Sequence, residues 1–275
     1  MWYLLALSLF TLQVNKNLSV ILLMVSTAVA GYTHVLDGKA LTLLIILAIL
    51  AVIYCKLSIK SKIISIMLEI ILLLTSVGLM MHVVPGFYNQ KILDNIRAGP
   101  ESASFSMYYN FDKAIIPFIL LICMKSLFTH NTQPYKRNGY WLLLIIAVPT
   151  LLIVAVIMGG LKVEFHHPEW LLSFIFANIF FVSLPEEALF RGYLQQRLSS
   201  VMPPVLALFI TSFLFGALHY AGGNMLIIFS TLAGFIYGLA WMLSGRLWVA
   251  VLFHAGLNLC HLLFFTYPLF QRIPY

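Results

Sequence analysis

Long apolar runs follow one another along the whole chain, and they restrict its fold more than any other feature of the sequence. Of the 275 residues, 62% are hydrophobic and 9% are charged, whereas about a quarter of the residues in a soluble domain are charged. This composition excludes both a soluble globular fold and a disordered chain. The approximate limits of the runs are 2–14, 17–33, 40–55, 63–84, 114–129, 140–161, 169–184, 203–220, 225–243 and 248–267.

These runs predict an all-α fold, a polytopic bundle of about 8–10 membrane helices. Several runs approach the roughly 20 residues that an α-helix needs to cross a hydrocarbon core. None shows the period-two alternation of a membrane β-strand, so a transmembrane barrel does not fit. We therefore expect a multi-pass integral membrane protein surrounded by a lipid bilayer, in the plasma or inner membrane if the source is prokaryotic.

The basic residues indicate how the chain is oriented in the membrane. The formal net charge is +7, and cytoplasmic connections are enriched in Lys and Arg. If the connection with Lys56, Lys60 and Lys62 is cytoplasmic, strict alternation places further basic residues on that side. These are Lys16, Lys125, Lys136, Arg137, Arg191, Arg197 and Arg246. The charge then reflects topology, and no nucleic-acid partner is expected, because basic clusters interleaved with exposed aromatic residues are missing.

The longest polar connection, about 85–113, falls on the outer side in this scheme. It contains Phe and Tyr residues, so we expect it to be folded, as a lid or a docking surface. The outer side also receives six basic residues and six acids that balance them. The basic residues are Lys39, Lys91, Arg97, Lys113, Lys162 and Arg272, and the acids are Asp37, Asp94, Glu101, Asp112, Glu164 and Glu169.

Three acids lie within the apolar runs or directly beside them: Glu69, Glu186 and Glu187. An ionised group at the centre of a membrane costs about 2.5–3.5 kcal/mol on insertion scales, so each acid is a candidate for function. Glu69 stands in IISIMLEIILLL with no obvious partner nearby. A structural or protonated carboxyl is the favoured interpretation for Glu69, and a chemical role is the alternative.

The two adjacent acids occur in LPEEALFRGYLQQRL. Glu187 and Arg191 are four residues apart, so on a helix they can form an ion pair. Glu186 points about 100° away from Glu187 and is free to face a cavity as a general base. Pro185 predicts a helix start or a kink just before the pair. The alternative is a salt-bridge cluster that only anchors the cytoplasmic end of a helix.

Two further polar motifs occur in apolar runs downstream, FGALH with Phe215 and His219, and HAGLN with His254 and Asn258. The members of each pair are four residues apart and share one helix face. A lone histidine in an apolar run is usually a packed core residue. Three separate polar sites are better explained if they converge in the bundle interior, because facing lipid would leave each of them without a partner. His261, two turns after His254, is expected to pack behind the site.

The order EExxxR, FxxxH, HxxxN, each in an apolar helix, resembles the CAAX prenyl protease 2 and bacteriocin-immunity family of intramembrane proteases. The resemblance covers about residues 169–267. It implies that Glu186 and His219 activate a water molecule, that His254 and Asn258 stabilise the oxyanion, and that neighbouring residues support the site. The supporting residues would be Glu187, Arg191 and Phe215. It also implies two parts of the chain, N-terminal transmembrane helices over 1–162 with the outer loop at about 85–113, and a catalytic helix bundle over 163–275.

A metal is an open alternative, because one Glu and two His match the ligands of a catalytic zinc site. The ligands would be Glu186, His219 and His254. The HExxH spacing of a metalloprotease helix is absent, and members of the family with known architecture resemble glutamate-type proteases. We therefore expect no cofactor and keep zinc as the alternative.

The sequence thus predicts an intramembrane endopeptidase that cuts a membrane-associated protein or peptide near the cytoplasmic face. One rival is a non-catalytic immunity or scaffold protein of the same fold. The complete set of motif residues argues against it, because a protein that only binds does not need a Glu, two His and an Asn in one cavity. The other is a proton-coupled transporter with Glu69, Glu186 and His219 as its relay. The chain shows no internal repeat, which weakens the transporter hypothesis.

Overall fold

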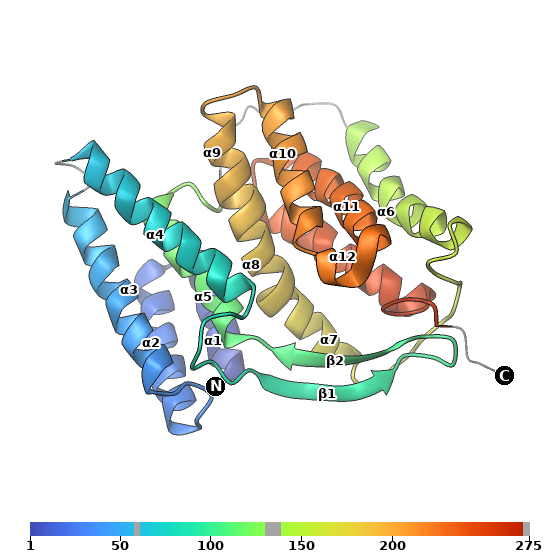
Figure 1. Ribbon diagram of the computed structural model, residues 1–275, viewed down its shortest axis with the longest axis horizontal. Helices are drawn as coiled ribbons and strands as arrows, with labels where there is room; N and C mark the ends of the chain where they lie inside the picture. The colour runs from blue at the N-terminus through green and yellow to red at the C-terminus, as the bar shows by residue number, and fades with distance from the viewer. Residues whose placement is uncertain (58–60, 130–138, 272–275) are drawn as a thin grey trace.

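The computed structural model describes residues 1–57, 61–129 and 139–271, and it is mostly helical (Figure 1). The predictions for Lys60, Lys136, Arg137 and Arg272 lie outside these described residues. The separate helices are α1 (Trp2–Thr11), α2 (Lys16–Tyr32), α3 (Gly38–Leu57), α4 (Lys62–Met80), α5 (Phe111–Cys123), α6 (Gly139–Ile157), α10 (Pro204–Ala217), α11 (Gly223–Ser244) and α12 (Leu247–Phe264).

A long central helix completes the bundle. It runs without a break over Leu171–Ser199 and alternates α-helical and π-helical turns. Its segments are α7 (Leu171–Ala177), η1 (Asn178–Ser183), α8 (Leu184–Glu187), η2 (Ala188–Gln195) and α9 (Gln196–Ser199). In Figure 1 the long helix lies between α1–α5 on one side and α6, α10, α11 and α12 on the other, and both groups contact it.

The predicted membrane bundle is confirmed. Among the described residues, six helices are long and apolar enough to cross a bilayer, and α1, α2 and α10 are shorter apolar helices. Many large apolar side chains on these helices are exposed on the isolated chain, for example Ile45, Leu142 and Leu172. Such exposure suits a surface that faces lipid, because lipid tails are as apolar as the side chains themselves.

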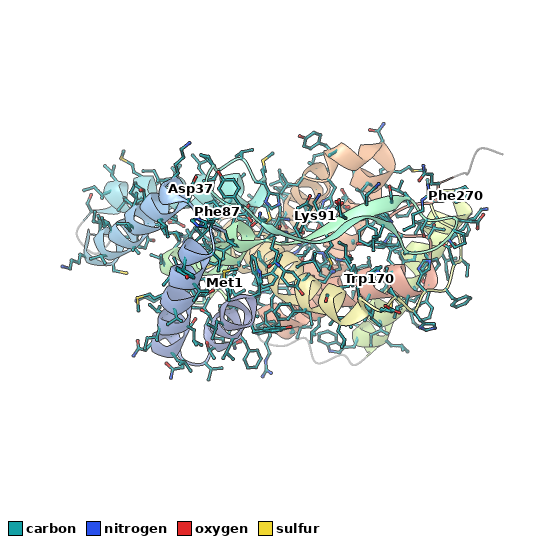
Figure 2. The ribbon with its side chains drawn as sticks, turned by 90° about the horizontal axis from the view of Figure 1, so that it is seen from below. Met1, Asp37, Phe87, Lys91, Trp170 and Phe270 are labelled. Carbon is teal, nitrogen blue, oxygen red and sulfur yellow. The ribbon has the colours of Figure 1, made fainter. Side chains whose placement is uncertain are left out.

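The connection over about 85–113 is folded, as expected, but its structure is a β-hairpin that the all-α prediction did not include. Strands β1 (Gln90–Arg97) and β2 (Ser104–Tyr109) pair antiparallel. Figure 2 shows the hairpin lying across one end of the bundle, between Phe87 and Phe270. Isolated bridges attach it there, from Leu36 to Phe87 and from Ser102 to Phe270.

The two ends of the bundle differ in the connections that they carry. We call the end covered by the hairpin the hairpin side, with connections 33–37, 81–110, 158–170, 218–222 and 265–271. We call the opposite end the basic side, with the described connections 12–15, 61, 124–129, 200–203 and 245–246. Contacts hold basic-side connections together, since Thr129 bridges to Arg246 and Gln196 donates a hydrogen bond to Ser126.

Candidate active site

The two adjacent glutamates lie in the middle of the long helix, on the α-helical turn α8 between two π-helical segments. Pro185 lies inside a continuous helix, so the predicted helix start is wrong, and the alternative of a kink at this position stays a prediction. Proline lacks an N–H and its ring crowds the preceding turn of an α-helix. Wider π turns relieve that crowding, and such turns occur frequently at functional sites.

Glu187 is fully buried and is the centre of an interior polar cluster. Its Oε1 accepts a hydrogen bond from Arg191 Nη1 at 3.0 Å, so the ion pair expected from the sequence is present. The same oxygen lies 2.9 Å from His254 Nδ1, a contact that the sequence did not indicate. Arg191 also donates to the carbonyl of Gly234 at 3.0 Å and lies over the Phe215 ring, 4.5 Å from its centroid.

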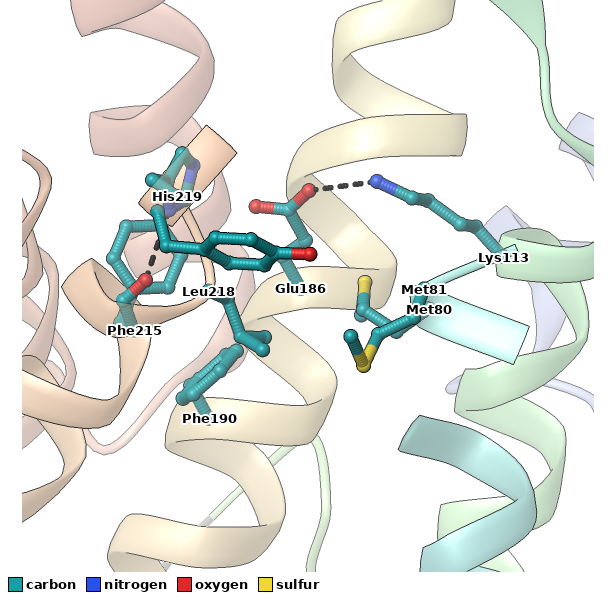
Figure 3. A pocket seen from close by; sticks show the side chains of 9 residues that line it. Met80, Met81, Lys113, Glu186, Phe190, Phe215, Leu218 and His219 are labelled. Atoms are coloured by element: carbon teal, nitrogen blue, oxygen red, sulfur yellow. Dashed lines mark hydrogen bonds and ion pairs between the residues drawn. The ribbon is translucent and has the colours of Figure 1, made fainter. Parts of the chain in front are cut away.

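Glu186 faces the other way, into a cavity of about 270 Å³ (Figure 3). The cavity is lined by side chains from several elements. They are Phe190, Phe215 and His219, Met80 and Met81 at the end of α4, Lys113 on the first turn of α5, and residues of the connection after α10. The Lys113 ammonium lies 3.1 Å from Glu186 Oε1. Both side chains are mostly buried, with exposed fractions of 15% and 10%.

Lys113 was not among the predicted site residues. It precedes Glu186 by 73 residues and belongs to a segment without a motif, so no signal in the sequence pointed to it. Its neighbour Asp112 fixes the start of α5. The Asp112 carboxylate binds His82 Nδ1 at 2.5 Å and accepts from Asn89 Nδ2 at 2.9 Å.

His219 lies two residues after the end of α10, and its ring contacts Phe215, with 4.9 Å between the ring centroids. The Nδ1 atom of His219 lies 2.9 Å from the Phe215 carbonyl oxygen. A carbonyl can only accept, so Nδ1 carries the proton, and Nε2 of the neutral ring is left as an acceptor. A histidine in this tautomer can hold a water molecule or take a proton from it.

His254 and Asn258 line a second, larger cavity of about 460 Å³ between α6, α11 and α12. The His254 ring stacks on Tyr237 at 4.6 Å, and Glu187 holds its Nδ1. Asn258 donates through Nδ2 to Asn178 Oδ1 at 2.8 Å. Asn178 was also missed, although a single amide in the apolar run FANIFF is a signal of the kind that marks functional positions in membrane helices.

The four predicted catalytic residues are therefore distributed over two cavities that meet at Phe215 and His219. Glu186 and His219 share the smaller cavity, and His219, His254 and Asn258 share the larger one. Chemically, this places an acid and an imidazole acceptor on one side of the junction, and the Asn258 amide donor beside the His254 imidazole on the other. Such a division suits attack of water on a polarised carbonyl.

The other sequence candidates lie outside this junction or behind it. Glu69 accepts from the Tyr193 hydroxyl at 2.6 Å and pairs with Arg197, so it has the structural partners that the sequence did not show. It does not line the cavity that contains Glu186. His261 lines the larger cavity and its Nε2 lies 3.1 Å from the Thr266 carbonyl oxygen.

The proposed zinc ligands do not fit a metal site in this arrangement. Within residues 1–57, 61–129 and 139–271, no three His, Cys, Asp or Glu side chains are grouped closely enough to hold a metal ion. Glu186 already binds Lys113, whose charge opposes a nearby divalent cation, and His254 Nδ1 is held by Glu187. We therefore derive no catalytic step through zinc.

Both cavities lie toward the hairpin side. The smaller one is lined by Met80 and Met81, Lys113 and Tyr220, at the hairpin-side ends of α4, α5 and α10. The larger one is bordered by 159–161 and by 267–270. From the sequence alone, the 85–113 connection is expected outside and the site near the cytoplasm. Because the structure brings both to one end of the bundle, these two expectations cannot both be right.

Taken together, the fold and the site define a helical membrane protein with an acid–imidazole pair in an interior cavity. Residues 168–260 match the family model described as type II CAAX prenyl endopeptidase Rce1-like. The chain thus contains an Rce1-like domain, which confirms the family resemblance carried by the three motifs. No curated protein and no solved structure matches the chain.

Proposed function

We propose that this protein is an intramembrane endopeptidase that hydrolyses a peptide bond of a membrane-associated protein or peptide. The observation that supports this most is the placement of Glu186 and His219 on one cavity, beside the cavity that holds His254 and Asn258. The match of residues 168–260 to a family of endopeptidases supports the same reaction class.

In the proposed reaction, Glu186 and His219 Nε2 hold a water molecule at the junction of the cavities. The water oxygen attacks the substrate carbonyl carbon while Glu186 accepts one of its protons. The C–N bond then breaks and the proton passes to the leaving amine, which gives a free acid and a free amine. A positioned acid–base group of this kind contributes about 10²–10⁴-fold to the rate.

His254 and Asn258 are proposed to stabilise the negative charge that develops on the carbonyl oxygen. One hydrogen of Asn258 Nδ2 is donated to Asn178, and the second is available to the substrate. Donation from His254 Nε2 requires the imidazolium form, in which Nδ1–H is donated to the carboxylate of Glu187. Glu187 would thus orient His254 and balance its charge.

Lys113 is proposed to hold the Glu186 carboxylate in place before the substrate binds. The 3.1 Å ion pair with Lys113 fixes Oε1 of Glu186. The other carboxylate oxygen, Oε2, can then accept a hydrogen bond from the water molecule. No metal takes part in this scheme, and the activity should survive chelators. A purified enzyme that contains one zinc per chain and loses both zinc and activity with a chelator would contradict it.

The proposal can be tested without a known substrate by mapping protein N-termini in membranes. Cells express the wild type, Glu186→Gln, or Glu169→Gln, which makes the same change at an exposed residue before the long helix. We expect new N-termini with the wild type and Glu169→Gln that are absent with Glu186→Gln. Identical N-termini in all three membranes would favour the binding protein of the same fold instead.

A further inference from the structure

The charges of the two ends of the bundle differ sharply. The basic-side connections and the helix ends next to them contain no Asp or Glu. Their basic residues are Lys16, Lys56, Lys60, Lys62, Lys125, Lys136, Arg137, Arg197 and Arg246, of which Lys60, Lys136 and Arg137 lie outside the described residues. Of the described members, Arg197 is paired with Glu69 on α4.

The hairpin side carries fewer basic residues, and acids accompany them. Among the described residues, five basic residues and six acids lie in its connections or at the adjoining helix ends, and Arg272 lies outside the described residues. Contacts pair Lys91 with Asp94 at 2.9 Å and Lys162 with Glu101, and Lys113 is paired with Glu186. The hairpin side is therefore close to neutral, although its connections are longer than those of the basic side.

This asymmetry orients the bundle. Short connections rich in Lys and Arg remain on the cytoplasmic side of a membrane, and acids influence this choice little. In the sequence, the connections from α3 to α4 and from α5 to α6, with their adjoining helix ends, contain six of the basic residues, and three of these six lie within the described residues. This rule predicts that the basic side is cytoplasmic and that the hairpin side faces away from the cytoplasm.

The site lies at the same end of the bundle as the hairpin, because the elements that border both cavities end on the hairpin side. Lys113 on the rim of the smaller cavity comes directly after the hairpin in the chain, and Tyr220 on the same rim is 65% exposed. Tyr267–Phe270 border the larger cavity, and Ala103 of the hairpin connection donates a backbone hydrogen bond to Leu269 at 3.0 Å. The hairpin is thus attached to the border of the site itself.

We propose that the catalytic cavity opens on the extracytoplasmic face, so that its substrate is a peptide segment presented on that face. Such a segment belongs to an exported peptide or to the extracytoplasmic part of a membrane protein. The inference about the substrate rests on the proposed protease function, whereas the orientation of the cavity does not. It replaces the expectation that cleavage occurs near the cytoplasm.

The orientation can be tested on the unmodified chain in spheroplasts of a bacterial expression host. A membrane-impermeant amine reagent is applied before or after permeabilisation, and labelled lysines are identified by mass spectrometry. We expect Lys91 of the hairpin to be labelled in intact spheroplasts, and Lys56 and Lys62 only after permeabilisation. The reverse pattern would overturn the proposal.

A reactive probe on the rim of the smaller cavity tests on which side of the membrane the cavity opens. In a background with Cys55→Ser, Cys123→Ala and Cys260→Ala, Tyr220→Cys places a thiol at the smaller cavity, and Asp94→Cys is the matched hairpin control. Both should react with an impermeant maleimide from outside. A Tyr220→Cys chain that reacts only after permeabilisation, beside an Asp94→Cys chain that reacts before it, would contradict an outward opening.

These experiments do not depend on activity, so they separate the two proposals. Outward labelling with no Glu186-dependent cleavage would retain the orientation and remove the protease. Cleavage that depends on Glu186, together with labelling of Lys56 in intact spheroplasts, would retain the protease and place its substrate at the cytoplasmic face.

Discussion

Two neighbouring carboxylates, Glu186 and Glu187, lie in regions of opposite character. Glu187 is sealed in the interior with Arg191 and His254, and its exposed fraction is 0%. Glu186 lines a cavity and pairs with Lys113 from a separate part of the chain. One step along a helix turns a side chain by about 100°, which is enough to separate them. In the proposed reaction, the buried cluster holds the architecture and the residues on the cavity carry out the chemistry.

The largest effect on activity is expected from Glu186→Gln. The amide retains the shape of the side chain but cannot accept the proton of water, so turnover should fall by about 10²–10⁴-fold. The melting temperature in detergent should fall less than that of Glu187→Gln, because Lys113, which loses its carboxylate, borders a cavity, whereas Arg191 is sealed in the interior. Turnover and thermal unfolding of the same preparation check both parts, and retained turnover would remove Glu186 from the role of base.

The largest effect on stability is expected from Glu187→Gln. It leaves the guanidinium of Arg191 without its carboxylate in the interior, and breaking a buried pair in this way costs about 3–5 kcal/mol. The melting temperature should fall clearly, together with activity, since His254 also loses the carboxylate charge that orients it. A Glu187→Gln protein that melts normally and is inactive would mean that the roles of the two acids are reversed.

Asn258→Ala examines the donors in the larger cavity. Removing one donor to a developing oxyanion costs about 10²–10³-fold in turnover, and substrate affinity should change little. Leu257→Ala, one residue earlier on the same helix, is a control for packing loss. If Asn258→Ala turns over as fast as the wild type, the oxyanion role of Asn258 is wrong.

Lys113→Met removes the cation that faces Glu186 while keeping the length of the side chain. Loss of one charge-assisted hydrogen bond should lower turnover about tenfold, which corresponds to ~1.4 kcal/mol. Lys113→Arg should restore part of the activity, because a cation is again present. Normal turnover of Lys113→Met would show that the ion pair is only a feature of the resting state.

The smallest effect is expected at Glu164, which lies outside both regions and attaches the hairpin. Burial alone would raise the pKa of Glu164. The carboxylate accepts hydrogen bonds from the Ser102 hydroxyl and the Glu101 N–H, and it contacts His166. These contacts outweigh burial and hold the pKa below its usual value of 4.5. Because the folded pKa is depressed, the stabilisation is present above pH 4.5 and disappears as the pH falls through the folded value.

Glu164→Gln should therefore lower the melting temperature slightly at neutral pH, by an amount that corresponds to about 1 kcal/mol. The difference from the wild type should shrink as the pH falls through the folded pKa of Glu164, because the carboxyl then becomes neutral like the amide. Thermal unfolding of both proteins across this range checks the sign, and a difference that grows in acid would contradict it.

The comparison also shows what the sequence can and cannot reveal. Apolar runs predicted the helices, because each lipid-facing helix must be apolar along its own length. The spacing of four predicted the contact between Glu187 and Arg191, because that contact is local to one helix. By contrast, the contacts of Glu186 with Lys113 and of Glu69 with Arg197 join positions 73 and 128 residues apart. They depend on how separate helices pack, which no local pattern encodes.

The central claim is that Glu186 faces the reacting water while Glu187 is sealed, and carboxyl labelling tests it most directly. The folded protein in detergent is treated with a water-soluble carbodiimide and an amine, and modified residues are located by fragment-ion mass spectrometry. We predict that Glu186 is modified in step with the loss of activity, and that Glu187 reacts only after unfolding. Modification of Glu187 in the folded protein, or inactivation while Glu186 stays unmodified, would contradict the account.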